Sequence, residues 1–338
     1  MLYRRSFLIF IFICYYCSAR SQSEFPAPKY PMRVIFDTDF GPDYDDVGAI
    51  TLLHGFADSG FIKILATVAS SKHKNAAAAI NVFNTYFNRP EIPIGVVRGN
   101  AVDLGDKQHW TDSVIKRYPH KIRSNGDAED ALVLYRKILS SQPDRSVTII
   151  TVGFLTNLAN LLGSGPDKYS TLNGADLIRK KVIGLVCMAG RFPSGREFNL
   201  DQDPGSSKKV LETWPGPILF SGFEIGQKIK TGLPLVRDNK IQLSPVKDVF
   251  AICIPMAAED SVGRMSWDET AVFVAVKGWR NYYDLQIGDC LINSDGSDEW
   301  INRDGMKARL IEKKSPQEMA IIINQLIMHQ PVGNPTNK

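Results

Sequence analysis

The sequence is poor in the residues from which many functional sites are built, with 5 cysteines and 5 histidines among 338 residues. After residue 19 it contains no Cys-x-x-Cys pair, which argues against a structural zinc site. Neither sign of charge dominates, because 40 Lys and Arg accompany 36 Asp and Glu. This balance argues against nucleic acid as a partner, since phosphate binding depends on clustered basic residues. With 44% hydrophobic residues, the composition also excludes a disordered chain.

Long apolar runs are scarce as well, and the clearest one lies at the N-terminus. Arg4 and Arg5 precede an apolar run at residues 7–16, and small residues follow it, so we interpret residues 1–19 as a secretory signal peptide. The run has about half of the roughly 20 residues that a membrane-spanning helix needs. We therefore expect a secreted or periplasmic protein without a stable membrane span after cleavage. An uncleaved anchor and a lipid-modified Cys17 are the alternatives.

Three cysteines would remain after cleavage, which is an odd number. At least one thiol is then unpaired or bonded to another chain. Cys187 lies in an apolar run and is expected in the core. The three are Cys187, Cys253 and Cys290.

The rest of the chain alternates between short apolar runs and amphipathic stretches. Residues 20–31 form a polar, proline-rich segment that we expect to be an exposed lead-in. Strand-like runs follow at residues 33–36, 62–69, 94–97, 146–152, 182–188 and 217–220, and helical patterns at 47–56, 75–87, 127–140 and from Ser315 onward. This alternation predicts an α/β fold with a mostly parallel central sheet flanked by helices, in one domain over residues 32–338.

Ligands of such sheets bind beyond the carboxyl ends of the strands, and the first strand is followed by an unusual concentration of acids. Five aspartates occupy the ten residues 37–46, before a helix. So much negative charge at one strand end is costly unless a cation neutralises it, and oxygen ligands favour Ca²⁺ or Mg²⁺ over zinc. The alternative is that two or three of these acids stabilise a helix N-terminus or a turn.

This segment resembles the calcium-dependent nucleoside hydrolase family, whose members carry Asp-x-Asp-x-Gly and then paired aspartates. Here these are residues 37–41 and Asp45-Asp46. The segments 151–157, 188–204 and 266–268 are similar to three further motifs of the family, in the same order. The resemblance spans nearly the whole chain after residue 32. It implies the family's fold and the hydrolysis of ribonucleosides, which are small-molecule substrates, to ribose and free base.

The resemblance also implies a role for individual residues. Ca²⁺ would be held by Asp39, Asp46, Asp268 and the backbone carbonyl of Val152. Asp39 would be the base that accepts a proton from the attacking water. The side chains of Asp45, Glu197 and Asn199 would hold the sugar hydroxyls.

Some members of the family have a histidine before the last aspartate, as the proton donor to the departing base. This sequence departs from that pattern. Trp267 stands there, as in a purine-preferring branch of the family, and would assist departure of the base by stacking. Trp110 would be a second stacking wall. The alternatives are core packing for Trp267, surface burial for Trp110, and His109 as the acid. We therefore expect a purine preference, while the oligomeric state stays open between a monomer and a homo-oligomer.

Two other functions remain to be distinguished from this one. A non-catalytic, calcium-dependent nucleoside or sugar-binding protein would have the same scaffold, although a pure binder needs no base such as Asp39. A haloacid-dehalogenase-type phosphatase also has Asp-x-Asp after its first strand, but such enzymes place Thr or Val where this chain has Gly41. Release of ribose from a nucleoside would exclude both.

Overall fold

A computed structural model describes residues 28–333 of the chain, so the expected signal peptide and most of the expected lead-in lie outside the described residues. The strands are β1 (Met32–Thr38), β2 (Ile62–Ala69), β3 (Ile94–Val96), β4 (Glu129–Asp130), β5 (Val147–Thr151), β6 (Val182–Met188), β7 (Ser194–Gly195), β8 (Ile218–Ser221), β9 (Lys230–Thr231), β10 (Arg264–Met265), β11 (Tyr283–Ile292), β12 (Asp298–Ile301) and β13 (Lys307–Glu312).

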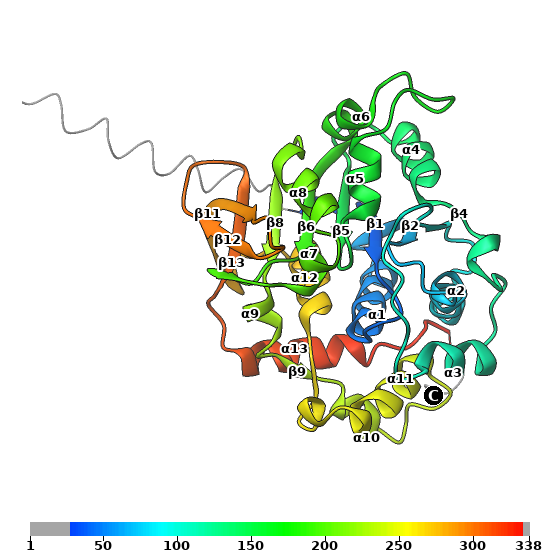
Figure 1. Cartoon of the computed structure of the whole chain (residues 1–338). Helices are drawn as coiled ribbons and strands as arrows, with labels where there is room; N and C mark the ends of the chain where they lie inside the picture. The colour runs from blue at the N-terminus through cyan, green and yellow to red at the C-terminus, as the bar shows by residue number, and fades with distance from the viewer. Residues whose placement is uncertain (1–27, 334–338) are drawn as a thin grey trace, which may run out of the picture.

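The helices alternate with these strands along most of the chain (Figure 1). They are α1 (Asp45–Asp58), α2 (Ala76–Tyr86), α3 (Trp110–Arg117), α4 (Ala131–Ser141), α5 (Thr156–Leu162), α6 (Gly174–Lys181), α7 (Phe198–Gln202), α8 (Pro204–Thr213), α9 (Phe223–Gly226), α10 (Leu233–Arg237), α11 (Pro245–Cys253), α12 (Trp267–Lys277) and α13 (Pro316–Ile327).

The central sheet has eleven strands in the order β4-β3-β2-β1-β5-β6-β8-β13-β11-β12-β7. The strands from β4 to β13 in this order pair in parallel, whereas β11, β12 and β7 pair antiparallel at one edge. The prediction of a mostly parallel sheet in an α/β fold is confirmed. The antiparallel edge was not predicted.

Two layers of helices cover the sheet because successive side chains of a buried strand face opposite sides. On β1, Val34 and Phe36 pack into one hydrophobic cluster with residues of α1, α2, α12 and α13. Ile35 packs into a second cluster with residues of α4, α5 and α8. Figure 1 shows α1 and α4 on opposite sides of the strands. Both faces of the sheet are therefore buried, as the continuous apolar runs predicted.

Local signals read from the sequence agree with several element boundaries. The strand predicted at 182–188 is β6, and the helix predicted from Ser315 onward is α13. A capping box begins α13, in which Ser315 Oγ accepts the N–H of Glu318 at 3.3 Å and Glu318 accepts the N–H of Ser315 at 2.9 Å. The helix predicted at 127–140 begins later, because Asp130 caps α4 by accepting the N–H groups of Leu132 and Val133.

The three cysteines in the described residues are buried and free, and Cys187 lies in the core as expected. None of the helices between residues 28 and 333 is long and apolar enough to cross a membrane.

Candidate active site

Six chain segments that follow strands, or begin a helix, meet at one cavity of about 430 Å³. They are the turn after β1, the loop between β3 and α3, the residue after β5, the segment from β6 to α7, the start of α9 after β8, and the start of α12. The cavity is lined by Asp39, Pro42, Asp43, Asp45, Leu104, Gly105, Lys107, Val152, Met188, Glu197, Phe198, Asn199, Gln202, Phe223, Trp267 and Asp268. The carboxyl ends of parallel strands thus bring residues more than 200 positions apart together.

Asp39 lies at the centre of the acidic turn and is 3% exposed. Burial, and then the charge of Asp43, raises the pKa of Asp39 well above its usual range. The turn after β5 packs closely on this residue, since a Cβ added at Gly153 would lie 2.4 Å from the backbone nitrogen of Asp39. Glycine at position 153 therefore allows β5 to bring Val152 beside the acidic turn.

Asp46 and Asp268 are also buried, and burial together with neighbouring carboxylates raises the pKa of each well above its usual range. After burial, the charge of Asp39 is the largest cause for Asp46, and Asp45, Asp46 and Asp39 all contribute for Asp268. Asp46 accepts the Thr38 hydroxyl through Oδ1, while its buried Oδ2 has no hydrogen-bond partner. Asp46 does not line the cavity in this structure. Among residues 28–333, no three His, Cys, Asp or Glu side chains converge into a closed metal-binding group.

These residues fit a divalent cation, although the carboxylates do not form a closed group in this structure. An unpartnered buried oxygen and repelling buried carboxylates are both stabilised when a divalent ion is bound. The donors are all oxygens, which is the set that hard cations such as Ca²⁺ prefer. Asp39, Asp46, Asp268 and the carbonyl of Val152 therefore remain suitable ligands.

Asp45 lines the cavity with both of its oxygens bonded to other parts of the protein. Oδ1 accepts a hydrogen bond from Arg264 at 2.9 Å, and Oδ2 accepts the N–H groups of Trp267 and Asp268, each at 3.2 Å. Burial and the charge of Asp43 raise its pKa to about 7, against the opposing effect of Arg264. Since a carboxylate has about four lone-pair sites, one further hydroxyl donor can still bind.

Glu197 and Asn199 hold the loop between β6 and α7. Glu197 accepts the N–H groups of Asn199 at 2.9 Å, Leu200 at 3.1 Å and Gly190 at 3.3 Å. Burial nevertheless raises the pKa of Glu197 to about 7. Asn199 Nδ2 donates to the carbonyl of Val152 at 3.1 Å and to that of Met188 at 3.2 Å. The same amide therefore orients the Val152 carbonyl, which was expected to bind the metal. The carbonyl oxygen keeps a second lone pair free for that purpose.

Trp267 lines the cavity and is held by three contacts. Its indole N–H donates to the carbonyl of Phe223 at 2.9 Å, the Phe223 ring stacks on it with centroids 5.0 Å apart, and the Arg264 guanidinium lies 5.0 Å from its ring centroid. These contacts fix the orientation of the indole within the cavity wall. Trp267 therefore presents an aromatic ring of fixed orientation to the cavity.

Trp110 does not lie where the sequence suggested. It is 0% exposed, packs edge-on against Phe40 with centroids 5.2 Å apart, and is absent from the cavity lining. Hydrophobic burial at the start of α3 explains this position better than a role in stacking. The expectation that Trp110 forms a second wall is therefore corrected. His109 is also outside the cavity lining.

Comparison with known proteins identifies the fold and the chemistry. The sequence profile of the inosine-uridine preferring nucleoside hydrolases matches residues 34–316. The chain belongs to this family. It is an enzyme that hydrolyses the N-glycosidic bond of ribonucleosides.

Relatives of this nucleoside hydrolase are distant. The pyrimidine-specific ribonucleoside hydrolase RihA of Salmonella agona is 24% identical over 229 residues, covering 65% of this chain and 69% of the relative. A plant nucleoside hydrolase structure covers 88% of this chain and 99% of the plant chain, with a TM-score of 0.67 and 19% identity. The purine-preferring ribonucleoside hydrolase of Gardnerella vaginalis has the same coverage and TM-score with 15% identity. The two structures support the fold alone.

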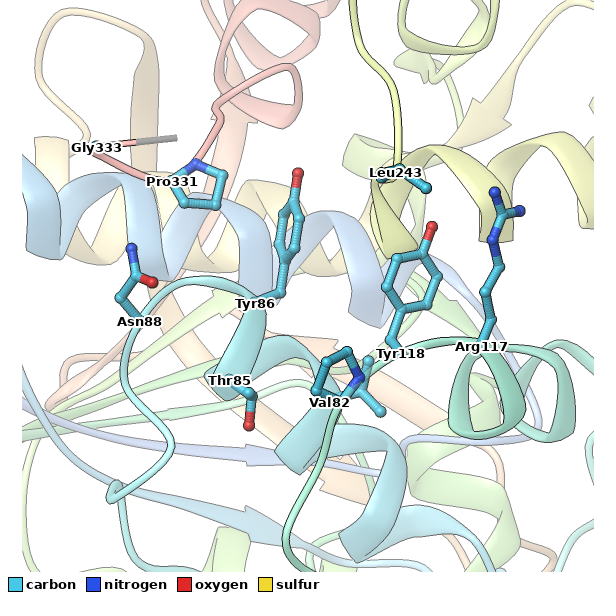
Figure 2. A pocket seen from close by; sticks show the side chains of 10 residues that line it. Val82, Thr85, Tyr86, Asn88, Arg117, Tyr118, Leu243, Pro331 and Gly333 are labelled. Atoms are coloured by element: carbon cyan, nitrogen blue, oxygen red, sulfur yellow. The ribbon is translucent and has the colours of Figure 1, made fainter. Parts of the chain in front are cut away.

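A second cavity of the nucleoside hydrolase, about 420 Å³, lies away from the acidic turn (Figure 2). Figure 2 shows the rings of Tyr86 and Tyr118 beside Leu243, Pro331 and Arg117. No residue of the acidic turn lines it. Because none of the residues that line it belongs to the family motifs, this second cavity is not a candidate for the hydrolytic site.

Among the cavity residues that reasoning from the sequence missed are two phenylalanines and a lysine. Phe198 is 44% exposed, and Phe223 stacks on Trp267. Lys107 enters the lining from the loop before α3. Phe198 stands between Glu197 and Asn199, which the sequence did identify as site residues. Its position between them was the signal available in the sequence. Phe223 and Lys107 have no comparable signal.

Proposed function

We propose that this nucleoside hydrolase is exported, depends on calcium, and prefers purine ribonucleosides. The observation that supports calcium dependence is the group of buried carboxylates at the strand ends, where Asp46 keeps an unpartnered oxygen. Ca²⁺ bound by Asp39, Asp46, Asp268 and the Val152 carbonyl would lower the pKa of a water molecule and orient it.

The residues of the chain supply the remaining requirements of glycosidic hydrolysis. Asp39 takes the proton of the attacking water, and its raised pKa makes its carboxylate a stronger base than an exposed aspartate. Negative charge from Asp45 and Glu197 lies beside the cavity and favours the cationic sugar of the transition state. Asp45, Glu197 and Asn199 accept or donate hydrogen bonds to sugar hydroxyls, which favours ribosides over deoxyribosides.

The purine preference rests on the aromatic part of the same cavity. Trp267, Phe223 and Phe198 all line it, and aromatic rings favour stacking with large bases. The printed activities of the relatives include pyrimidine-specific and purine-preferring hydrolases, so the base must be determined by assay. Export is supported by the pattern of residues 1–19.

One experiment tests hydrolysis, calcium and base preference together. Purified protein is incubated with inosine, guanosine, adenosine, uridine and cytidine, and free base is measured before EGTA, after EGTA, and after Ca²⁺ is restored. We expect release that is fastest with purines, stops with EGTA and returns with Ca²⁺. Activity that persists in EGTA would refute calcium dependence, and faster release from pyrimidine nucleosides would refute the preference. Binding of inosine without release would favour the non-catalytic alternative.

Export is tested separately on the full chain. Expressed with residues 1–19, the protein is collected from the medium and from the periplasmic fraction of a bacterial host, and its N-terminus is sequenced. We expect a chain that begins at Arg20. Retention of residues 1–19 on a membrane-bound product would support the uncleaved anchor instead.

A further inference from the structure

One positively charged side chain, that of Arg264, lies among the acids of the site, and the proposed hydrolytic mechanism assigns it no role. Arg264 lies in β10, which pairs with β9, and is 6% exposed. Its guanidinium forms ion pairs with Asp43, with Asp45 at 2.9 Å and with Asp260 at 3.5 Å. In residues 28–333, every ion pair made by the acidic segment 37–46 is made with Arg264. A buried guanidinium is tolerated only when it is paired in this way.

Arg264 joins parts of the site that are far apart in the sequence. Its partner Asp45 lies at the start of α1, 219 positions away. On the other carboxylate oxygen, Asp45 accepts the N–H groups of Trp267 and Asp268 at the start of α12. The Asp45 carboxylate is thus held from two sides, by one terminal nitrogen of the guanidinium and by the first turn of α12, while the other terminal nitrogen faces Asp260.

The same guanidinium also bears on the aromatic wall. It lies 5.0 Å from the ring centroid of Trp267 and 4.6 Å from that of Tyr44. The Tyr44 hydroxyl donates to Asp260 at 2.6 Å, so the anchor on the far side of Arg264 is itself fixed. Asp260 and Tyr44 are buried and do not line the cavity. Arg264 is therefore held by buried residues on one side and contacts three residues that do line the cavity, which are Asp43, Asp45 and Trp267.

We propose that Arg264 is a positioning residue that fixes the Asp45 carboxylate and the Trp267 indole, and thereby sets the selectivity for sugars that carry both ribose hydroxyls. This inference rests on the proposed role of Asp45 in holding a sugar hydroxyl. A carboxylate fixed in one direction binds a hydroxyl at one position strongly and gains nothing from a sugar that lacks it. A carboxylate free to rotate discriminates less.

The test compares substitutions at two buried arginines. Arg264→Gln removes the charge, and Arg264→Lys keeps the charge but loses the fork. Arg136→Lys is the matched control, because Arg136 is 2% exposed and pairs with Asp167 at 2.9 Å. It lies on α4 and does not line the cavity. For each variant, kcat and KM are measured with inosine, 2′-deoxyinosine and 3′-deoxyinosine, and folding is checked by circular dichroism.

The expected readout is the ratio of kcat/KM for inosine to that for each deoxy analogue. Arg264→Gln loses the charge-assisted hydrogen bond to Asp45, and Arg264→Lys loses the rigid fork whose two nitrogens reach Asp45 and Asp260 at once. At least one ratio should therefore fall about tenfold or more in these variants, while Arg136→Lys keeps the wild-type ratios. Unchanged ratios in both folded Arg264 variants would overturn the inference and leave the proposed function intact. A wild-type protein that releases no base from inosine or any other nucleoside would overturn both.

A second variant covers the case in which neither Arg264 variant folds. Asp260→Asn keeps an acceptor for the Tyr44 hydroxyl but removes one of the three charges that hold Arg264. Because Asp260 touches no substrate, a purely structural role would leave the ratios unchanged. We expect at least one ratio to fall about threefold. Wild-type ratios in Asp260→Asn would then overturn the inference.

Discussion

Substitution of Asn199 by Asp changes one atom of the site and tests whether this amide organises it. The Asn199 Nδ2 donates to the carbonyls of Val152 and Met188 at 3.1 and 3.2 Å, and the residue is 5% exposed. Asp has the same shape but places an acceptor where the donor was. Both carbonyls then face a carboxylate oxygen instead of an N–H group.

The magnitude follows from counting these contacts. Each of the two buried carbonyls left without a donor costs about 1–3 kcal/mol. A total loss of roughly 2–6 kcal/mol in the free energy of unfolding is therefore expected. If about 2 kcal/mol of this is lost at the transition state, kcat/KM falls roughly thirtyfold. Because the Val152 carbonyl also turns away, we expect weaker retention of Ca²⁺.

The matched control is the same substitution at another buried asparagine. Asn81 is 1% exposed, but its Oδ1 accepts the N–H groups of Lys121 and Ile122 at 2.7 and 3.2 Å. Asn81→Asp keeps both of these bonds, loses only the long 3.4 Å contact of Nδ2 with the carbonyl of Pro90, and lies outside the cavity lining. Chemical denaturation and inosine kinetics of both variants check the reasoning. Equal stability losses, or wild-type kcat/KM in Asn199→Asp, would refute it.

Three further predictions follow from the site and the core. Asp39→Asn should reduce kcat by at least about a hundredfold, the lower range for a general base, with an unchanged circular dichroism spectrum; near-normal turnover would reject Asp39 as the base. Trp267→Ala should lower kcat/KM more with inosine than with an activated aryl riboside, because only the natural base needs assistance to leave, and equal losses would contradict that role. Burial lowers the pKa of His54 to about 3, so the unfolded chain alone binds a proton below pH about 6.5 and stability falls by about 2 kcal/mol at pH 5. His54→Gln should lack this loss in denaturation at pH 7.5 and pH 5, and the same pH dependence in both proteins would contradict the assignment.

The parallel part of the sheet could be predicted because its strands are buried on both faces. A continuous apolar run such as 182–188 has no polar residue to obscure it, and β6 occupies the same residues. The antiparallel edge could not be predicted in the same way. β11 mixes exposed, half-buried and buried residues without a regular pattern. Its place in the sheet depends on pairing with β13, which no local signal specifies.

The candidate site was predictable where motifs follow strand ends. Asp39, Asp45, Glu197, Asn199 and Asp268 were all expected to converge, and all line one cavity. Trp110 shows the limit of this reasoning, because a tryptophan in a polar loop gives no indication of the direction of its side chain. Its ring turns inward onto Phe40, where hydrophobic burial is available.

Arg264 shows a different limit, which concerns how charge is balanced rather than where it lies. The sequence indicated that the acids of 37–46 require a cation, and reasoning from the motifs assigned that whole requirement to a metal. The structure supplies one positive charge from the protein itself, 219 and 221 positions away from the acids it pairs with. That charge faces Asp43 and Asp45, whereas the unpartnered oxygen belongs to Asp46. The acidic turn therefore divides into a part neutralised by Arg264 and a part left for an external cation, and only the second part should lose order when Ca²⁺ is removed.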